Sequence, residues 1–484
     1  MASLTIDALR AREASRVFRV PGPTKRIALR SDHALFLCPP TGSWAIVPTS
    51  LAGSIENILS AAQSGDLDRI PDADTSELVQ DLYAAGLLSI RGKASWQGVD
   101  FDNAQARVNT LILKMVGHCN IACTYCYDFS EETFKSKLSV EQATRAIDQA
   151  LPLAGPTLNV LFHGGEPLLA FRRIQAITEY ALTRTKETGQ QILFSIQTNG
   201  TRFTDEIVDF LIAHEFSVGV SLDGPPEFND VHRVTFQGGG TGEPILRNLK
   251  KYTGLRQRLG VLTTVTQANC GSLRDIARYF RDFGVERWDI TVFQDSGRAA
   301  NKASRFAPDS ETLIAGYRDL LDGVEAGEFD TMEVRPVLHY VRNLLNFERR
   351  NMCLRNGCGA AKELVSISAD GTIESCDCVA NPALSLGHMQ RNSLAEAVAS
   401  PAATRIRTRT VDALQPCRTC DWRIFCGGTC LAKAGDVHAI DESECRLSLA
   451  LFPDILQRLA RSDKLVRYVE RFSRPVAAGR PEPA

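Results

Sequence analysis

Short apolar runs alternate with amphipathic stretches through the middle of the chain. Six runs rich in β-branched residues and leucine are typical of strands: Arg107–Met115, Thr157–His163, Ile192–Thr198, Ser217–Leu222, Gly260–Thr266 and Arg287–Phe293. Helical periodicity lies between them, for example at Ser139–Leu151, Arg172–Thr188, Thr204–His214 and Ser272–Phe283. Repeated β–α units predict a parallel sheet, because each right-handed crossover returns the chain to the same side. The pattern therefore predicts the α/β class, with chemistry on loops at the carboxyl ends of the strands.

The repeat count favours a partial (β/α)6 TIM-like barrel over eight closed strands. Before it, three short strands are predicted at Arg26–Arg30, His33–Cys38 and Ser43–Val47, followed by helices near Leu51–Gln63 and Thr75–Leu87. These elements predict a small α+β, winged-helix-like domain, and polar Gly92–Asn103 is expected to be a linker. The expected segments are this domain over 1–95, the barrel over 105–310, a helical connection over 311–352 (helical pattern Glu311–Arg350), a loop-rich domain over 353–450, and a C-terminal helix with a disordered tail over 451–484.

Composition narrows the class of protein. A formal net charge of −2 over 484 residues does not indicate binding to nucleic acid or to an anionic membrane. No apolar stretch reaches the length of a membrane span, and the first thirty residues lack the apolar region of a signal peptide. We therefore expect a cytoplasmic protein. The basic run Arg405–Arg409 is expected to be a solvated helix face.

The chain has 14 cysteines. In a reducing cytoplasm, grouped cysteines indicate metal binding more often than disulfides. Most of them fall into two tight groups, whereas Cys38, Cys270 and Cys378 stand apart. We expect the first two of these to pack as apolar side chains.

The first group, Cys119, Cys123 and Cys126, follows the first barrel strand. Three thiolates at this spacing can hold one [4Fe–4S] cube and leave its fourth iron open to another ligand. The alternative is a zinc site that lacks a ligand, or one that His118 completes.

The second group contains eight cysteines: Cys353, Cys358, Cys376, Cys417, Cys420, Cys426, Cys430 and Cys445. Eight thiolates suffice for two fully ligated four-iron clusters. A pair of zinc ribbons is the alternative, since spacing alone does not separate the two.

The Cys-x3-Cys-x2-Cys spacing, with Tyr125 before the last cysteine, resembles the defining motif of the radical S-adenosylmethionine (SAM) superfamily. The resemblance covers about residues 107–295 and includes motifs at three further strand ends. It implies that the open iron binds SAM and that these residues contact the cofactor: Gly164, Gly165, Glu166, Pro167, Gln197, Thr198, Asn199, Ser221 and Asp223. Asn-Gly and Asp-Gly are also strong turn formers, so turn chemistry alone is the alternative.

From Cys358 onward the second group resembles the seven-cysteine signature of the SPASM domain. The resemblance implies one auxiliary cluster on Cys353, Cys358, Cys376 and Cys430, and another on Cys417, Cys420, Cys426 and Cys445, with Cys378 as a possible substitute ligand. It also implies that Asp377 is a catalytic base, for which a raised pKa in a dry pocket would be useful. An exposed Asp in a polar loop is the alternative.

Together these features resemble radical SAM peptide and protein maturases, and most of all the enzymes that mature the small subunit of quinohemoprotein amine dehydrogenases. The resemblance implies three [4Fe–4S] clusters, SAM, and thioether bonds from Cys sulfur to Asp or Glu carbon in a peptide or small protein subunit. It further implies a reductant such as flavodoxin or ferredoxin, and substrate binding by the first domain, through an added strand. For the first domain, the alternative is a role in folding alone. For the whole chain, the alternatives are a sulfatase-type maturase that forms formylglycine and a non-catalytic iron–sulfur electron carrier.

Overall fold

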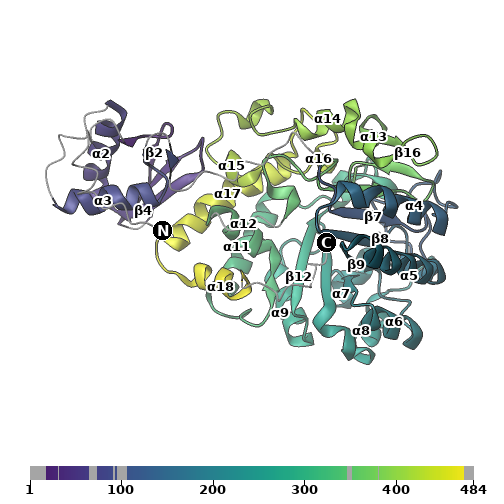
Figure 1. Cartoon of the computed structure of the whole chain (residues 1–484). Coiled ribbons are helices and arrows are strands. Elements are labelled where there is room, and N and C mark those ends of the chain that lie inside the picture. The colour runs from purple at the N-terminus through teal and green to yellow at the C-terminus, as the bar shows by residue number, and fades with distance from the viewer. Residues whose placement is uncertain are drawn as a thin grey trace.

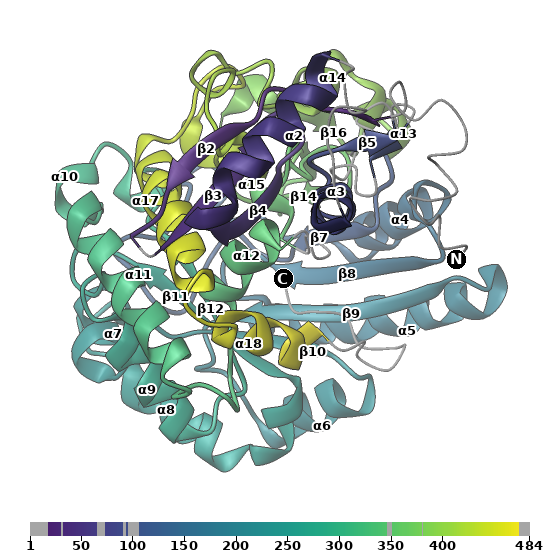
Figure 2. The same cartoon turned by 90° about the vertical axis from the view of Figure 1, so that its left-hand side faces the viewer.

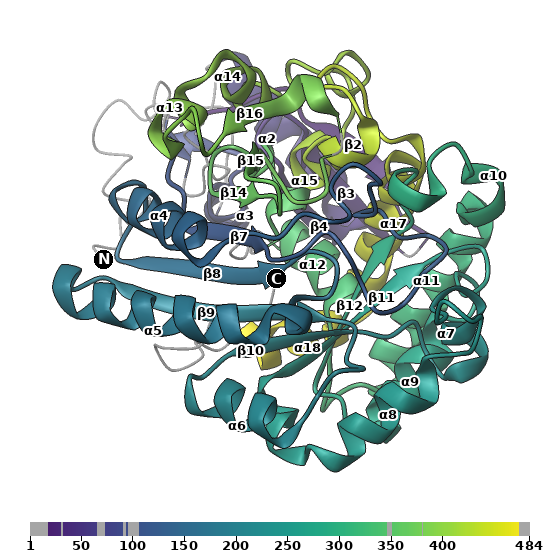
Figure 3. The ribbon, with the colours of Figure 1, turned by 90° about the vertical axis from the view of Figure 1, so that its right-hand side faces the viewer.

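A computed structural model describes residues 18–30, 32–64, 73–90, 93–94, 106–345, 351–379 and 381–473. Its largest element is a ten-stranded sheet in the order β13-β12-β11-β10-β9-β8-β7-β14-β15-β16 (Figure 3). All six predicted barrel strands are present: β7 (Thr110–Lys114), β8 (Thr157–His163), β9 (Gln191–Thr198), β10 (Ser217–Ser221), β11 (Leu259–Val265) and β12 (Arg287–Val292). They pair in parallel, and the sheet has two free ends, so the prediction of an α/β fold with an open barrel is confirmed.

Helices cover the outer face of these strands (Figure 3). The four predicted ones are α4 (Val140–Ala150), α5 (Phe171–Thr188), α6 (Asp205–Ala213) and α9 (Leu273–Phe283). Each buries an apolar stripe, for example Ile174, Ile177 and Ala181 of α5. Two helices between β10 and β11 were not predicted, namely α7 (Pro226–His232) and α8 (Gly242–Lys251).

The helical connection expected at Glu311–Arg350 is interrupted, so that prediction is wrong in part. Helix α11 (Ser310–Glu325) ends before Gly327, whose φ of 79° no helix continues. The chain then forms β13 (Glu333–Val334), which pairs with β12, and Pro336 lies in the first turn of α12 (Arg335–Leu344). Residues 346–350 lie outside the described part.

The cysteine-rich segment continues the barrel sheet. Strand β14 (Leu364–Ile367) lies parallel to β7, and β15 (Thr372–Glu374) and β16 (Ser385–His388) extend the sheet in antiparallel fashion. The helices that follow are short except the last two: α13 (Leu394–Ala399), α14 (Pro401–Arg407), α15 (Arg423–Cys426), α16 (Leu431–Ala434), α17 (Glu442–Leu459) and α18 (Lys464–Ser473). The expected single C-terminal helix is thus two, and the disordered tail expected beyond them lies outside the described residues.

The prediction of a solvated face at the basic run Arg405–Arg409 is wrong in part, because Arg405 and Thr408 are exposed but Arg407 and Arg409 are not. Arg407 and Arg409 are 8% and 2% exposed, because each guanidinium is buried against backbone carbonyl groups. The charge pattern alone could not show this, since long side chains at a helix end can fold back into the protein.

The amino-terminal segment has its own core and lies beside α12 and α17 (Figures 1 and 2). As predicted, it contains an antiparallel sheet of β2 (Lys25–Ala28), β3 (His33–Cys38) and β4 (Ser43–Pro48), with helices α2 (Ala52–Ser64) and α3 (Ala73–Ala84). Three very short strands, β1 (Phe18–Arg19), β5 (Ser89–Ile90) and β6 (Lys93–Ala94), form a second sheet. Much of the expected linker lies outside the described residues.

Few polar contacts join this segment to the rest. Trp44 Nε1 donates to the carbonyl oxygen of Leu344 at 2.7 Å, and Lys25 pairs with Asp421 at 2.7 Å. Cys38 and Cys270 are buried in apolar clusters, as expected. Within the described residues, none of the helices combines the length and the apolar character needed to cross a membrane.

Candidate functional site

The first cysteine loop leaves the carboxyl end of β7 and packs on Phe293, Ala299 and Phe306. Its three thiols lie close enough to act on one another electrostatically. Burial raises the pKa of Cys119 to about 11 and that of Cys126 to about 12, and it also raises the pKa of Cys123. Bound iron would supply the positive charge that these thiolates need, so the loop fits a metal cluster. The ring of His118 packs on Phe134.

Tyr125 anchors this loop to the barrel. Its hydroxyl donates to Asp223 Oδ2 at 2.5 Å and accepts a hydrogen bond from Arg233 at 3.1 Å. The other oxygen of Asp223 accepts the backbone N–H of Thr264 at 2.9 Å. Burial raises the pKa of Asp223, although the Arg233 charge opposes it. Both carboxylate oxygens of Asp223 thus already have protein partners that order the cysteine loop.

The Gly-Gly-Glu-Pro motif after β8 contacts the same loop. Gly164 and Gly165 have φ values of 80° and 52°, and a Cβ at Gly165 would clash with the carbonyl group of His118. Glu166 is fully buried and accepts hydrogen bonds from Thr198 Oγ1 at 2.7 Å and Asn199 N at 2.8 Å. Pro167 begins a short 3-10 helix, so the turn stays close to the cysteines.

The ends of β9 and β10 complete this side of the site. Asn199 Nδ2 donates to the sulfur of Cys119 at 3.4 Å, and Gln197 Nε2 donates to Ser221 Oγ at 2.9 Å. The structure therefore brings the residues predicted to bind the cofactor to one end of the barrel, around the first cysteine loop.

One set of auxiliary cysteines gathers next to β15. The thiols of Cys353 and Cys430 share a hydrogen bond, and Cys358 interacts electrostatically with Cys430. Cys376 and Cys378 also share a hydrogen bond, and Cys353 is among the charges that act on Cys376. These five thiols are linked pairwise, one more than a cube needs, and the ligand atoms of Cys376, Asp377 and Cys378 lie within 4.8 Å of one another.

The other set lies between the short helix α15 and the first turn of α17. The charges that act on Cys417 are those of Cys426, Cys420 and Cys445, in that order, and burial raises its pKa to about 11. Cys445 in turn interacts with Cys426 and Cys420. Apart from the additional Cys378, these groupings agree with the pairing that the SPASM resemblance implied, which stays a prediction.

Asp377 lies between the first cysteine loop and the auxiliary cysteines. Its Oδ2 accepts a hydrogen bond of 3.0 Å from Tyr127, the residue after Cys126. The expectation of a raised pKa is wrong: burial raises the pKa of Asp377, but His163, Lys114 and two hydrogen bonds outweigh burial and lower it. Asp377 is therefore an ionised carboxylate at neutral pH, able to accept a proton, and it is not in an exposed loop.

Lys114 is a site residue that the sequence analysis missed. Its ammonium group, at the end of β7, pairs with Asp128 at 2.8 Å and with Glu374 at 3.1 Å. Asp128 also accepts the backbone N–H of Gly165 at 3.2 Å. Lys114 thus links the first cysteine loop to β15, two residues before Cys376. A lysine that ends an otherwise apolar strand was the available signal.

A cavity of about 360 Å³ opens beside these groups. Its lining includes Lys114, Tyr127, Asp128, Asp377 and Cys378. A substrate side chain in this cavity would lie between residues 127–130, which follow the first cysteine loop, and the Asp377 carboxylate; the residues predicted to contact SAM are not part of this lining.

Two family models match the chain. The Radical SAM superfamily matches residues 113–278, and the SPASM iron–sulfur cluster-binding domain matches residues 358–421. The first match contains the first cysteine loop and the motifs after β8, β9 and β10. The second contains Cys358, Cys376, Cys417 and Cys420, and Cys426, Cys430 and Cys445 follow it.

The chain is similar to curated sulfatase-maturating enzymes. It is 23% identical to the cysteine-type anaerobic enzyme of Clostridium novyi, over 67% of this chain and 87% of that one. It is 25% identical to the serine-type enzyme of Klebsiella aerogenes, over 66% of this chain and 79% of that one.

Solved structures show the same fold. The anSMEcpe structure with bound AdoMet superposes with a TM-score of 0.63 at 19% identity, over 75% of this chain and 98% of that one. Streptococcus suis SuiB bound to precursor peptide SuiA superposes with a TM-score of 0.54 at 14% identity, over 87% of this chain and all (100%) of that one. The chain therefore contains a radical SAM domain over residues 113–278 and an SPASM iron–sulfur cluster-binding domain over residues 358–421, and it shares its fold with these solved structures.

Proposed function

We propose that this protein is a maturase that modifies side chains of a peptide or protein and joins a cysteine sulfur to a carbon of an Asp or Glu side chain. The observation that carries the proposal is the placement of Asp377. Its ionised carboxylate lines a cavity between the first cysteine loop and the auxiliary cysteines. A carboxylate there can accept the proton of a substrate thiol, and the auxiliary clusters held by the neighbouring cysteines would accept the electron that remains when the carbon–sulfur bond forms.

Three four-iron clusters fit the thiol groups. Cys119, Cys123 and Cys126 would hold one and leave an iron open, whereas the sets around Cys430 and Cys445 would each hold one completely. Cys378 would be a fifth thiol beside the set around Cys430, since it shares a hydrogen bond with Cys376.

The cofactor would lie at the carboxyl ends of β8, β9 and β10. The residues that would hold it are Gly164, Gly165, Glu166, Pro167, Gln197, Thr198, Asn199, Ser221 and Asp223. When bound, cluster and SAM together supply a 5′-deoxyadenosyl radical that takes a hydrogen atom from the substrate. Gly164 and Gly165 leave room for a ligand close to the backbone, and Glu166 and Asn199 fix the turn that faces the Cys119 thiol.

The residues in and next to the cavity have different roles in the proposed reaction. Asp377 accepts the proton of the substrate thiol, Tyr127 orients that carboxylate through its hydrogen bond, and His163 lies on the other side of Tyr127 at 3.5 Å. Lys114 keeps Asp128 and Glu374 in place, so the two walls of the cavity hold a fixed separation.

A peptide substrate is also supported by the relatives. One similar structure is described as anSMEcpe with AdoMet and the Cp18Cys peptide, and another as SuiB with precursor peptide SuiA. The match to SuiB covers 87% of this chain, against 73% for the anSMEcpe complex. We infer that the amino-terminal segment takes part in substrate binding, with the exposed edge strand β2 as the acceptor of an added strand. A flavodoxin or ferredoxin in a reducing cytoplasm would supply the electrons.

Formylglycine formation is the second candidate, because curated sulfatase-maturating enzymes match two thirds of this chain. A non-catalytic electron carrier does not account for a radical SAM domain with a carboxylate-lined cavity.

Mass spectrometry of the product separates the two candidates. Peptides encoded by neighbouring genes are incubated with the reconstituted enzyme, SAM and reductant, and then alkylated. A peptide that contains the thioether keeps the cysteine sulfur, is lighter than the unmodified peptide by two hydrogen atoms and is not alkylated at that cysteine. Formylglycine made from cysteine loses the sulfur and yields an aldehyde that reacts with hydrazides. Aldehyde formation without any cross-link would overturn the thioether proposal. If peptides stimulate SAM cleavage but none of them is modified, both the thioether and the formylglycine candidates are overturned.

A further inference from the structure

Arg409 lies in the segment that follows α14, and its guanidinium is buried at 2% exposure. It donates hydrogen bonds to the carbonyl oxygens of Gly428 at 2.9 Å, Thr429 at 3.1 Å and Ala439 at 2.8 Å. Gly428 and Thr429 lie between Cys426 and Cys430, which belong to different auxiliary sets. Arg409 is therefore held against the segment that joins the two sets.

No acidic side chain balances this charge. Among the described residues, no carboxylate forms an ion pair with Arg409, whereas buried Arg355 pairs with Glu363 at 2.6 Å. The acidic group that acts on Arg409, Glu444, is already paired with Lys433 at 2.6 Å and accepts the Cys430 N–H at 2.8 Å. The Nε of Arg409 is buried without a hydrogen-bond partner. A buried cation without a counter-charge is strongly unfavourable, and a guanidinium stays protonated in proteins.

Thiols of both auxiliary sets act on this cation electrostatically. Burial lowers the pKa of Arg409, and the groups that oppose burial most are Cys358 and Cys430 of one set and Cys417 of the other. A four-iron cluster with four thiolate ligands carries net negative charge, and it gains one more when it is reduced. Clusters at the two sets would therefore supply the counter-charge that the protein itself does not.

We propose that Arg409 is a positioning residue shared by both auxiliary clusters, and that its fixed positive charge stabilises them and favours their reduced state. The inference rests on the proposed assignment of eight cysteines to two four-iron clusters. In each reduction the cluster accepts one electron from an external low-potential reductant, and no bond forms or breaks at Arg409. Arg409 touches neither substrate nor SAM.

The test is a redox titration followed by electron paramagnetic resonance. It uses the full-length chain with Cys119, Cys123 and Cys126 replaced by alanine, so that only auxiliary clusters give signals. In this background we compare Arg409→Gln, Arg409→Lys and the control Arg407→Gln. Arg407 is also buried and bound to carbonyl groups, those of Ala361 and Val398, but burial alone acts on its pKa and no thiol does.

Removing a unit charge about 10 Å from a cluster changes the reduction equilibrium by about tenfold at an effective dielectric constant of about 20. Arg409→Gln should lower the ratio of reduced to oxidised auxiliary cluster by about tenfold, a shift of about −59 mV for a one-electron couple. Arg409→Lys and Arg407→Gln should remain near the parent value.

Iron content and reduction potential together test the inference. Full iron content and unchanged potentials in Arg409→Gln would overturn the inference alone. If Arg409→Gln loses iron, retention of iron by Arg409→Lys supports the role of charge, and equal loss in both variants overturns it. Zinc in place of iron in the parent protein would overturn the proposed function together with this inference.

Discussion

The hydroxyl group of Tyr127 donates a hydrogen bond of 3.0 Å to Oδ2 of Asp377, across 250 positions of sequence. Tyr127 directly follows the last cysteine of the first loop, and Asp377 directly follows an auxiliary cysteine. This bond joins the two cysteine-rich regions at the cavity, so a substrate side chain that enters it meets both at once.

Replacing Asp377 by asparagine keeps the side-chain volume and removes the proton acceptor. A general base contributes about 10²–10⁴-fold to a rate, so product formation should fall by about that range. Release of deoxyadenosine should continue, because removal of hydrogen precedes the step that needs the base. Liquid chromatography measures the rates at which the modified peptide and deoxyadenosine are formed.

The control for this variant is Asp412→Asn, since Asp412 is a 74% exposed carboxylate of the same region. It should leave both rates unchanged. Full turnover by Asp377→Asn with normal iron content would remove Asp377 from the reaction, whereas loss of iron in that variant would show damage to the Cys376 loop.

The first cysteine loop should account for one cluster of three. Protein reconstituted without oxygen should bind about three four-iron clusters, and alanine at Cys119, Cys123 and Cys126 should remove one and abolish SAM cleavage. Iron and sulfide analysis checks this. Cys270→Ala, which changes a buried thiol in an apolar cluster, should keep all three. A wild-type protein that holds zinc only would contradict the cluster assignment.

Lys114→Met should destabilise the protein strongly. It leaves Asp128 and Glu374, which are 14% and 21% exposed, without their cation, and the cost is about 2 kcal/mol, below the about 3–5 kcal/mol of a fully buried pair. Chemical denaturation measures the loss. The matched control is Lys251→Met, because Lys251 and its partner Asp205 are 58% and 77% exposed and such a pair contributes little. Equal stability of the two variants would show that the Lys114 contacts contribute nothing.

Deletion of residues 1–95 should raise KM for the full-length substrate or abolish its modification. Cleavage of SAM without substrate should survive, because the amino-terminal segment has an apolar cluster of its own and contributes only the edge of the main core, through Leu35 and Leu37 of β3. Steady-state kinetics with long and shortened peptides measures the effect. Unchanged modification by the truncated enzyme would assign the segment a purely structural role.

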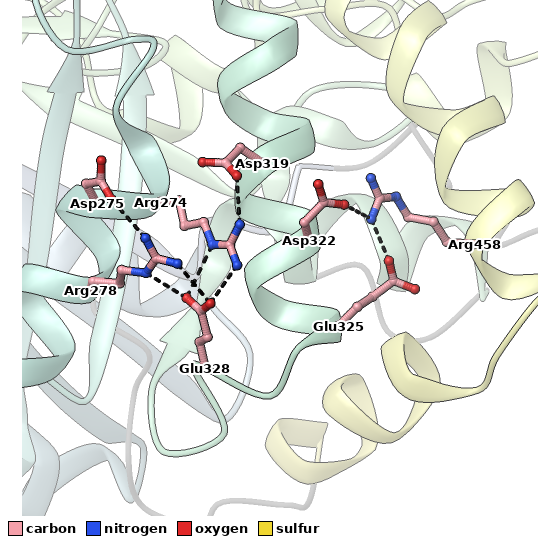
Figure 4. Close-up of polar contacts among 8 residues, drawn as sticks. All are labelled: Arg274, Asp275, Arg278, Asp319, Asp322, Glu325, Glu328 and Arg458. Atoms are coloured by element: carbon pink, nitrogen blue, oxygen red, sulfur yellow. Dashed lines mark hydrogen bonds and ion pairs between the residues drawn. The ribbon is translucent and has the colours of Figure 1, made fainter.

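Glu328 predicts a pH-dependent contribution to stability. Its carboxylate accepts hydrogen bonds from Arg278 and Arg274, which lower its pKa to about 2 (Figure 4). A depressed pKa stabilises the folded state above the usual value of 4.5, and this contribution is lost as pH falls from there toward about 2. Since Glu328 is 21% exposed, Glu328→Gln should cost about 1–2 kcal/mol near neutral pH.

The difference between wild type and Glu328→Gln should narrow as the pH is lowered below 4.5. Urea denaturation of both proteins across this range measures it. A difference that stays constant down to about pH 3 would mean that the ionised carboxylate is not its source.

The sequence predicted the barrel strands and most of their helices because β–α repeats carry a strong periodic signal, as in Thr157–His163. It also predicted which cysteines gather together, although through the resemblance and not through spacing. It missed α7, which has seven residues and too few turns to show a period. It also missed β13, whose two residues are defined only by pairing with β12.

Electrostatic properties were predicted least well, because they depend on neighbours distant in sequence. Asp377 was expected to have a raised pKa from its position beside a cysteine, but Lys114 and His163 come from other strands and lower it. Arg409 was expected on a solvated face, and its burial depends on carbonyl groups of a later loop.

Strand β14 is paired in parallel with β7 from Leu364↔Thr110 to Ile367↔Leu113. A slip of one residue in this register would turn every β14 side chain to the opposite face, so the alignment is fixed once the sheet has formed. The position of the auxiliary-cysteine segment relative to the first cysteine loop is thus fixed when the sheet forms. The walls of the cavity that β7 and β15 provide, at Lys114 and Glu374, are therefore held at a distance set by the pairing of the strands.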